Sequence, residues 1–319
     1  MPLNPQTRLI LGVLLSCLVL SLIVHISYKQ SMTTKQTESF GRQSLLSPDP
    51  VTGLTDDEKQ KTTEPTKSTY SLRELICKED KQLVDQIIHM DVKNKAEYLR
   101  LITKPVQSAC KSRLRLGGHK AGASAWDGHK FVCEDDLEGL IGGTQSCLVY
   151  SFGISGDLSF ENQMAAIGCT VHAYDHTIKS LPATSFPHKI HWHKVGMASN
   201  NDKSDLKTLG YLIGHNGHSN DIIHYLKVDI EGEERNSIPE WIRSGSLANV
   251  KQIGIEFHQG DNGKNFQSYA EITKLLSQHG FKLISWDPNM VVTSNLKSGP
   301  YSCFEVVFRK TELIDCRGI

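Results

Sequence analysis

Apolar residues follow two spacings along the chain, and each predicts a type of element. From residue 147 onward, short apolar runs of strand length alternate with segments of helical periodicity. The expected strands are 147–152, 170–175, 189–195, 222–230, 250–257, 281–287 and 303–310. The expected helices are 159–168, 206–213, 238–244 and 269–278. This alternation predicts an α/β fold with seven strands in a mostly parallel sheet, whose last two strands form an antiparallel edge because no helix separates them.

The N-terminal part has a different pattern. Residues 9–26 contain no Asp, Glu, Lys or Arg, and as a helix of about 1.5 Å per residue they would approach the thickness of a bilayer. They predict a transmembrane signal anchor over 9–27 behind a short tail, 1–8; a cleaved signal peptide is the alternative. Residues 28–69 are polar and Pro-containing, so we expect a disordered stalk.

Residues 70–143 form a separate expected unit, a helical cap followed by a glycine-rich loop. Ser71 and Glu74 have the capping-box spacing, and apolar residues recur at helical spacing through to residue 90. A second helix is expected over 96–103, before Pro105. Residues 110–143 carry many glycines and are expected to be irregular. The main domain then spans 144–319.

The charge balance bears on the class of partner, and the cysteines bear on the cellular compartment. Thirty-five basic residues balance thirty-five acidic ones, which argues against a nucleic-acid partner. The flanking charges do not decide membrane orientation. A large domain after a short tail favours a type II protein with a lumenal domain in the Golgi or endoplasmic reticulum, where disulfides form. Cys110 and Cys133 are the expected pair, whereas Cys147 and Cys169 are interpreted as unpaired small residues at strand starts.

A glycine turn between the first strand and the following helix is the first candidate site. Gly153 and Gly156 lie in this turn, and Asp175 ends the second strand. Glycines let a ligand approach the backbone, and an acidic residue about 20 positions further on can bind a ribose. The G-x-G-x-x-G pattern is incomplete, because Ser151 stands in the first glycine position. A plain turn capped by Asp175 is the alternative.

The segments YSFGISGDLSFE and LKVDIEGEE resemble the methyltransferase-domain family that includes methyltransferase-like protein twenty-four, and D-x-E-G-x-E is similar to an FkbM-type motif. The resemblance covers about residues 110–310. It implies a Rossmann-like class I methyltransferase domain and S-adenosylmethionine as cofactor. The residues it assigns to the cofactor are Gly153 and Gly156 at the methionine part, Asp175 at the ribose, Asp229 at the fourth strand and Glu161 in the helix after the turn. One departure is that Ser151 and its neighbours lack the acidic residue common in this strand.

Methyl transfer to a hydroxyl often needs a base. His258 follows the fifth strand at the same sheet edge and is the first candidate, because a neutral imidazole titrates near physiological pH. Glu231 is the second expected catalytic residue. Paired carboxylates are able to hold a divalent metal, but no metal site is predicted, and the histidines match no zinc spacing.

These observations together predict an S-adenosylmethionine-dependent methyltransferase of the secretory pathway that modifies a hydroxyl of a glycan or small molecule. The membrane would be contacted through the N-terminal helix. A catalytically inactive protein on the same fold and a Golgi glycosyltransferase are the alternatives, and an NAD oxidoreductase is disfavoured by the incomplete glycine pattern.

Overall fold

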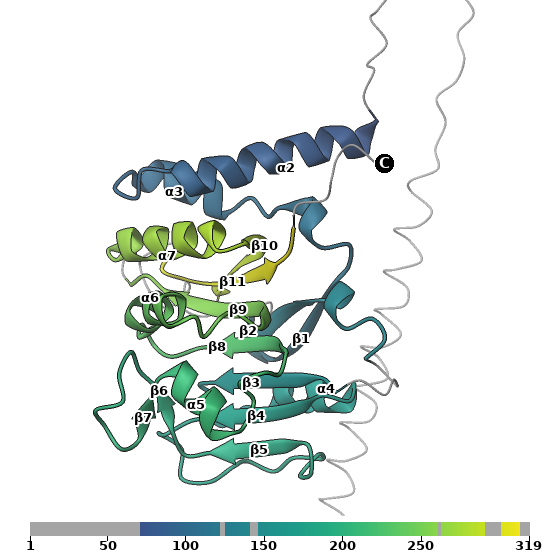
Figure 1. The fold of residues 1–319 in the computed structure, drawn as a ribbon, viewed down its shortest axis with the longest axis vertical. Coiled ribbons are helices and arrows are strands. Elements are labelled where there is room, and N and C mark those ends of the chain that lie inside the picture. Colours follow the sequence, from purple (N-terminus) through teal and green to yellow (C-terminus); the bar gives the residue numbers. More distant parts are fainter. Residues whose placement is uncertain (1–70, 122–124, 141–145, 261–262, 291–300, 313–319) are drawn as a thin grey trace, which may run out of the picture. The chain divides into compact units, whose positions relative to one another are not determined.

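The computed structural model describes residues 71–121, 125–140, 146–260, 263–290 and 301–312. A seven-stranded sheet lies at the centre of this region, in the order β10-β11-β9-β8-β3-β4-β5 (Figure 1). Its strands are β3 (Leu148–Phe152), β4 (Thr170–Tyr174), β5 (Ile190–His193), β8 (Ile223–Val228), β9 (Val250–His258), β10 (Phe281–Pro288) and β11 (Cys303–Lys310). The predicted α/β class and the seven-stranded sheet are confirmed.

The directions and order of the strands determine where a ligand would bind. Strands β5, β4, β3, β8 and β9 run parallel, whereas β11 is antiparallel to both β9 and β10. The expected antiparallel edge is therefore present, but β11 lies inside it, between β9 and β10. The chain builds outward from β3 first toward β5 and then toward β10. Ligands of such sheets bind where the strand order reverses, beyond the carboxyl ends of the strands.

The two faces of the sheet are covered differently (Figure 1). One face packs with three helices, α5 (Leu209–His215), α6 (Glu234–Ser244) and α7 (Phe266–Gln278). The other face packs with one helix, α4 (Ser159–Ala166), and a hairpin of β1 (Arg113–Ala121) and β2 (Ala125–Cys133). Successive side chains of β3 alternate between the faces, so Tyr150 belongs to the first core and Val149 to the second.

The N-terminal helices extend the first core. Helix α2 (Leu72–His89) begins at Ser71 with the expected capping box, in which Ser71 and Glu74 each accept the other's backbone N–H. Helix α3 (Lys95–Ile102) follows, and both helices contact α7. Asn94 caps α3 by accepting a hydrogen bond from Glu97 N. Their buried residues join the core around α7, so these helices complete the main domain.

The glycine-rich segment differs from the expected irregular loop, because it contains the β1–β2 hairpin. Its glycines permit close packing: at Gly117, with φ of 68°, a Cβ would lie 2.6 Å from the Phe160 backbone of α4. Two short 3-10 helices flank the hairpin, η1 (Gln107–Ala109) and η2 (Glu134–Asp136). A further small pair, β6 (Gly196–Met197) and β7 (Leu206–Lys207), was also not expected from the sequence.

Two disulfides lie on the hairpin side of the sheet. Cys110 is bonded to Cys133, as predicted. Cys147 is bonded to Cys169, so the interpretation of these two as unpaired is wrong. The physical reason is the sheet register: Leu148 lies opposite Thr170, and the residues just before them are brought to a Cα separation of 4.4 Å. Cys77 is also disulfide-bonded, and Cys303 is the free cysteine of the described part of the chain.

The predicted signal anchor, 9–27, and stalk, 28–69, lie outside the described residues. Within the described part, from residue 71 onward, no helix has both the length and the apolar character needed to cross a bilayer.

Replacing both Cys147 and Cys169 by Ser should lower the free energy of unfolding by about 3 kcal/mol, because the lost bridge closes a loop of about 20 residues in the unfolded chain. Urea unfolding of the oxidised protein measures the loss. A matched variant with Cys110 and Cys133 both replaced by Ser tests the second bridge of similar loop length. An unchanged urea midpoint in the first variant would show that this bridge does not form.

Candidate functional site

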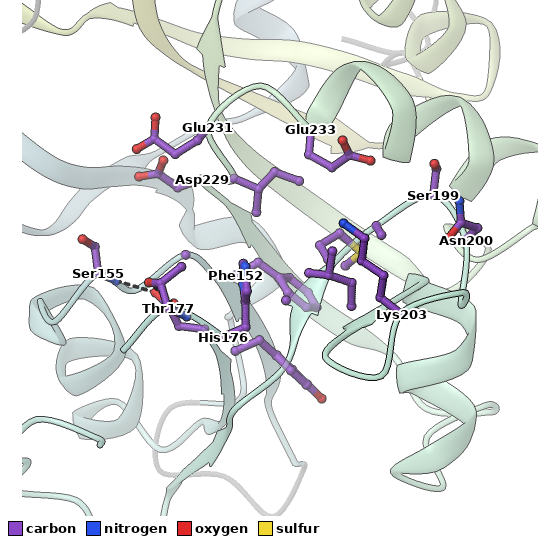
Figure 2. Close-up of a pocket in the computed structure, with 18 residues that line it drawn as sticks. Phe152, Ser155, His176, Thr177, Ser199, Asn200, Lys203, Asp229, Glu231 and Glu233 are labelled. Carbon is purple, nitrogen blue, oxygen red and sulfur yellow. Dashed lines mark hydrogen bonds between the residues drawn. The ribbon is translucent and has the colours of Figure 1, made fainter. Parts of the chain in front are cut away.

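A cavity of about 620 Å³ opens beyond the carboxyl ends of β3, β4 and β8 (Figure 2). Three loops supply much of its wall: the glycine turn after β3, the segment after β4 and the segment after β8. Its lining includes Phe152, Gly153, Ser155, Tyr174, Asp175, Thr177, Met197, Asp229, Glu231 and Glu233. The volume falls within the range of about 300–1,000 Å³ that is typical of small-molecule sites.

The glycine turn is locked against the end of β8. Asp229 N donates to Phe152 O at 3.1 Å, which continues the β3–β8 pairing past the strand. Gly153 has φ of 75°, and a Cβ built there would lie 1.6 Å from the carbonyl oxygen of Asp229. Only glycine fits this position, because both its backbone conformation and the space exclude a side chain. The turn also holds Ser155 at φ of 44° and Gly156 at φ of 90°.

Asp175 ties the glycine turn to the segment after β4. Its Oδ2 accepts from Ser155 N at 2.8 Å, and its Oδ1 accepts from the N–H and hydroxyl of Thr177. Burial raises the pKa of this carboxyl, but the hydrogen bonds from Thr177 and Ser155 lower it below its usual value. The carboxylate is therefore ionised and fixed at the cavity wall.

Glu161 lies behind the turn and outside the cavity lining. It is fully buried, accepts a hydrogen bond from the Ser151 hydroxyl, and lies 3.6 Å from Lys227 Nζ. Lys227 in turn donates to Gly153 O at 3.1 Å. A carboxylate therefore does lie beside the first strand, supplied by α4, and in this structure it supports the turn through Lys227.

Stacked rings form the wall on the β4 side. Phe152 and Tyr174 both line the cavity, with ring centroids 4.5 Å apart. Tyr174 also stacks on His193 at 4.5 Å, and His193 stacks on His172. Burial, together with His193, lowers the pKa of His172 to about 3, so this histidine is neutral and part of the aromatic core. A flat apolar wall of this kind suits a planar ring of a ligand.

A group of acidic side chains, the carboxylate cluster, lies at the carboxyl ends of β8 and β9 and on β11. Its members are Asp229, Glu231, Glu234, Glu256 and Glu305. Asp229 and Glu256 share a hydrogen bond. Burial and the charge of Asp229 raise the pKa of Glu256, whereas the charges of Lys130 and Lys227 lower that of Asp229 despite its burial. The proton of this pair therefore resides on Glu256.

His258 points into this cluster. Its Nδ1 lies 3.2 Å from Glu234 Oε1, and its Nε2 lies 3.6 Å from Glu231 Oε2 and 3.8 Å from Asp229 Oδ1. Burial lowers its pKa, but the hydrogen bond with Glu234 and the surrounding negative charges outweigh burial and raise the pKa to about 9. At neutral pH the ring is protonated, so it does not fit the expected role of a neutral base.

Lys130 is the buried cation of the cluster. It is fully buried on β2, and its Nζ lies 2.5 Å from Glu305 Oε1 and 3.9 Å from Asp229 Oδ2. Burial lowers its pKa, but Glu305, Asp229 and Glu256 raise it above its usual value. Burial disfavours the charged form of Glu305 as well, and this raises the pKa of its carboxyl group to about 8. The hairpin therefore supplies charge compensation to carboxylates on three other strands or loops.

The structure brings most of the predicted site residues together. Gly153, Asp175, Asp229 and Glu231 line one cavity, Gly156 lies in the same turn, and His258 contacts Asp229 and Glu231 from behind. Sequence reasoning missed a second set of residues: Lys130, Glu234, Glu256, Cys303 and Glu305. A signal existed for two of them, because Glu256 and Glu305 are single charges inside otherwise apolar strand runs.

Comparison with known families decides what this fold is. The family model for a methyltransferase domain matches residues 72–301. The chain belongs to this methyltransferase family. The match spans the capping helices, the hairpin and nearly the whole sheet, so these parts form one family unit.

Curated relatives agree with this assignment. This chain is 27% identical over 172 residues to the human "probable methyltransferase-like protein 24". The matched stretch covers 48% of this chain and 46% of the relative. The rat protein of the same name is 32% identical over 171 residues, covering 48% of this chain and 47% of the relative. The matched part thus spans about half the length of these relatives.

Solved structures show weaker similarity. A putative tRNA methyltransferase of Streptococcus pneumoniae, solved with S-adenosyl-L-methionine, is 12% identical with a TM-score of 0.33, covering 57% of this chain and 74% of that one. The N-methyltransferase NodS of Bradyrhizobium japonicum is 10% identical with a TM-score of 0.29, covering 56% and 93%. These values are too low to transfer any property to this methyltransferase-domain protein.

Gly153→Ala should destabilise the protein more than Gly156→Ala. Both changes force an alanine into a left-handed conformation, which costs about 1–2 kcal/mol. Only at Gly153 does the Cβ meet the Asp229 carbonyl, whereas at Gly156 nothing lies within 4 Å. We expect an additional loss of about 2 kcal/mol or more for Gly153→Ala in urea unfolding. Equal losses in the two variants would contradict the interlock.

Lys130→Met should lower the free energy of unfolding by about 3–5 kcal/mol, because it leaves Asp229, and Glu305 once it ionises above its pKa of about 8, without their buried cation. The matched control is Lys120→Met, because Lys120 is an exposed residue of β1. This change should alter the free energy of unfolding by less than about 0.5 kcal/mol. Thermal and urea unfolding of both variants measure the difference. A small effect of Lys130→Met would show that Glu305 is neutral without its partner.

Proposed function

We propose that this methyltransferase-family protein binds S-adenosylmethionine in the cavity beyond β3, β4 and β8 and transfers its methyl group to a hydroxyl oxygen. The observation that carries the proposal is the joining of the glycine turn, the ionised Asp175 and the aromatic wall around one cavity. When bound, this cofactor supplies an electrophilic methyl group.

The residues present fit such a ligand. Asp175 Oδ2 accepts one hydrogen bond from Ser155 N, and a carboxylate oxygen has capacity for a second, from a ribose hydroxyl. Phe152 and Tyr174 offer stacked ring surface for an adenine. The absence of a side chain at Gly153 keeps the turn close to Asp229, so the methionine part would lie along the turn between Asp175 and the carboxylate cluster.

The acceptor would enter at the end of the cavity formed by Asp229, Glu231 and Glu233. Figure 2 shows the carboxylates of Asp229 and Glu231 lying next to each other there, with Glu233 directed elsewhere. Glu231 is exposed and is held at φ of 54°, a conformation that is uncommon for non-glycine residues and that clusters at functional sites. A polar, acidic entrance suits a hydroxylated acceptor, which we propose is a glycan or a small molecule.

We also propose that the domain works in the lumen of the secretory pathway, behind a signal anchor over residues 9–27. The two disulfides of the described region support this location, because such bonds persist in oxidising compartments and are rare in the cytosol. The glycan acceptor follows from this location and from the FkbM-like motif.

Calorimetric titration of the full-length protein, solubilised in mild detergent, tests cofactor binding. S-Adenosylmethionine and S-adenosylhomocysteine should each bind at one site, whereas NAD and UDP-sugars should not. Asp175→Asn should weaken binding by about 10-fold, since it removes a charge-assisted hydrogen bond worth about 1.5 kcal/mol.

Asp221→Asn is the control for this variant, because Asp221 precedes β8 and therefore lies at the opposite edge of the sheet from the cavity. Its affinity should equal that of the unaltered protein. Binding of a UDP-sugar in place of either cofactor would favour a glycosyltransferase. A folded protein that binds none of the ligands would favour a non-catalytic member of the family.

A further inference from the structure

Three side chains at the acceptor end of the cavity converge as metal ligands do. His258 Nε2 lies 3.8 Å from Asp229 Oδ1 and 3.6 Å from Glu231 Oε2, and the three ligand atoms all lie within 4.8 Å of one another. Ligand atoms at about 2.1 Å from a shared ion are about 3.0–3.4 Å apart. The two carboxylates therefore need to approach His258 Nε2 by only about half an ångström to share an ion with it.

For two of the three ligands, His258 and Asp229, a contact on the other side determines which atom is free. Glu234 is fully buried and lies 3.2 Å from His258 Nδ1, which leaves Nε2 directed at the carboxylates. A carboxylate on the far nitrogen of a histidine is the usual support of a metal-ligating imidazole. On Asp229, Lys130 Nζ lies near Oδ2, whereas Oδ1 faces His258. These two half-buried ligands are thus held from behind by charged groups.

A separate observation concerns a buried carboxyl group of the cluster, Glu305. Glu305 lies opposite Glu256 in the β9–β11 register, on the same face of the sheet. Only 4% of Glu305 is exposed, and its Oε2 has no hydrogen-bond partner among the described residues. Buried carboxylates are costly unless a cation or hydrogen-bond donor compensates them.

We propose that Asp229, Glu231 and His258 bind one divalent metal ion at the mouth of the cavity. Two carboxylates and one imidazole suit ions such as Mn²⁺ or Zn²⁺. Cys303 is not included, because its thiol donates to Glu256 Oε1 at 2.8 Å. Three protein ligands leave coordination positions open, and since Asp229 and Glu231 line the cavity, these positions face the acceptor.

The ion would assist the proposed methyl transfer by activating the acceptor. This part of the inference rests on the proposed function. A hydroxyl of the acceptor that bound the ion would lose its proton to solvent water more readily, because the cation would stabilise the alkoxide. The alkoxide oxygen would form the new bond to the methyl carbon as the bond from sulfur to that carbon breaks, and S-adenosylhomocysteine would be the leaving group. The substrate class is then an acceptor whose reacting oxygen, or a neighbouring hydroxyl, coordinates a metal. Binding of the ion would displace the proton from His258 Nε2, and the ring would then serve as a neutral ligand instead of a base.

The test is titration of the EDTA-treated full-length protein with Mn²⁺, with free Mn²⁺ measured by electron paramagnetic resonance. We expect saturation at one ion per chain. Glu231→Gln should weaken binding by about 10-fold or more, and Asp229→Asn by more again. Glu271→Gln makes the same chemical change on the exposed side of α7, where the carboxylate accepts a hydrogen bond from Gln267 Nε2. It should leave Mn²⁺ affinity unchanged.

Calorimetry with S-adenosylhomocysteine in EDTA is run on the same samples, so that the two proposals fail separately. A protein that binds the cofactor product but shows no saturable Mn²⁺ binding overturns the metal site alone. Mn²⁺ binding that Glu231→Gln and Asp229→Asn leave unchanged overturns it too. Saturable Mn²⁺ binding without cofactor binding keeps the metal site and overturns the proposed function. Glu231 is largely exposed, so Glu231→Gln remains informative if Asp229→Asn does not fold.

Discussion

The contact between Gly153 and the carbonyl of Asp229 is the constraint on which the site depends. It fixes the turn after β3 against the end of β8, and every other feature of the cavity is placed relative to it. Lys227 reinforces the contact by donating to Gly153 O while lying beside Glu161. Asp175 holds the opposite side of the turn through Ser155 N. A rigid turn matters because a catalytic ligand must be held close to its productive geometry.

The second constraint is the negative charge of the carboxylate cluster, which the β1–β2 hairpin compensates. Parallel strands that end at one edge bring Asp229, Glu256 and His258 together, and the antiparallel β11 adds Glu305. Without Lys130 from β2 this concentration of carboxylates would be strongly destabilising. The hairpin therefore covers one face of the sheet, where a fold of this class would ordinarily place helices, and also brings a cation to the site. The two roles explain why a glycine-rich segment is packed so closely on α4 and β9.

The raised pKa of His258 changes the chemistry expected of it. A base must be neutral at the working pH, whereas this ring is stabilised in its charged form by Glu234 and its neighbours. The same carboxylates that make the ring a poor base make its Nε2 a member of a ligand-like group. The proposed metal ion would need the same deprotonated Nε2, so at this place the ion and the proton compete for one nitrogen.

The sequence by itself determined the strand and helix pattern, the sheet class, the glycine turn and four residues of the cavity wall, because these depend on local periodicity and short spacings. Tertiary structure alone decided the insertion of β11, the Cys147–Cys169 bond and the carboxylate cluster. Each joins residues distant in the chain, such as Lys130 and Glu305, whose contact follows from sheet order and hairpin docking. Side-chain pKa values belong with these features, since burial and neighbouring charge exist only in the folded chain.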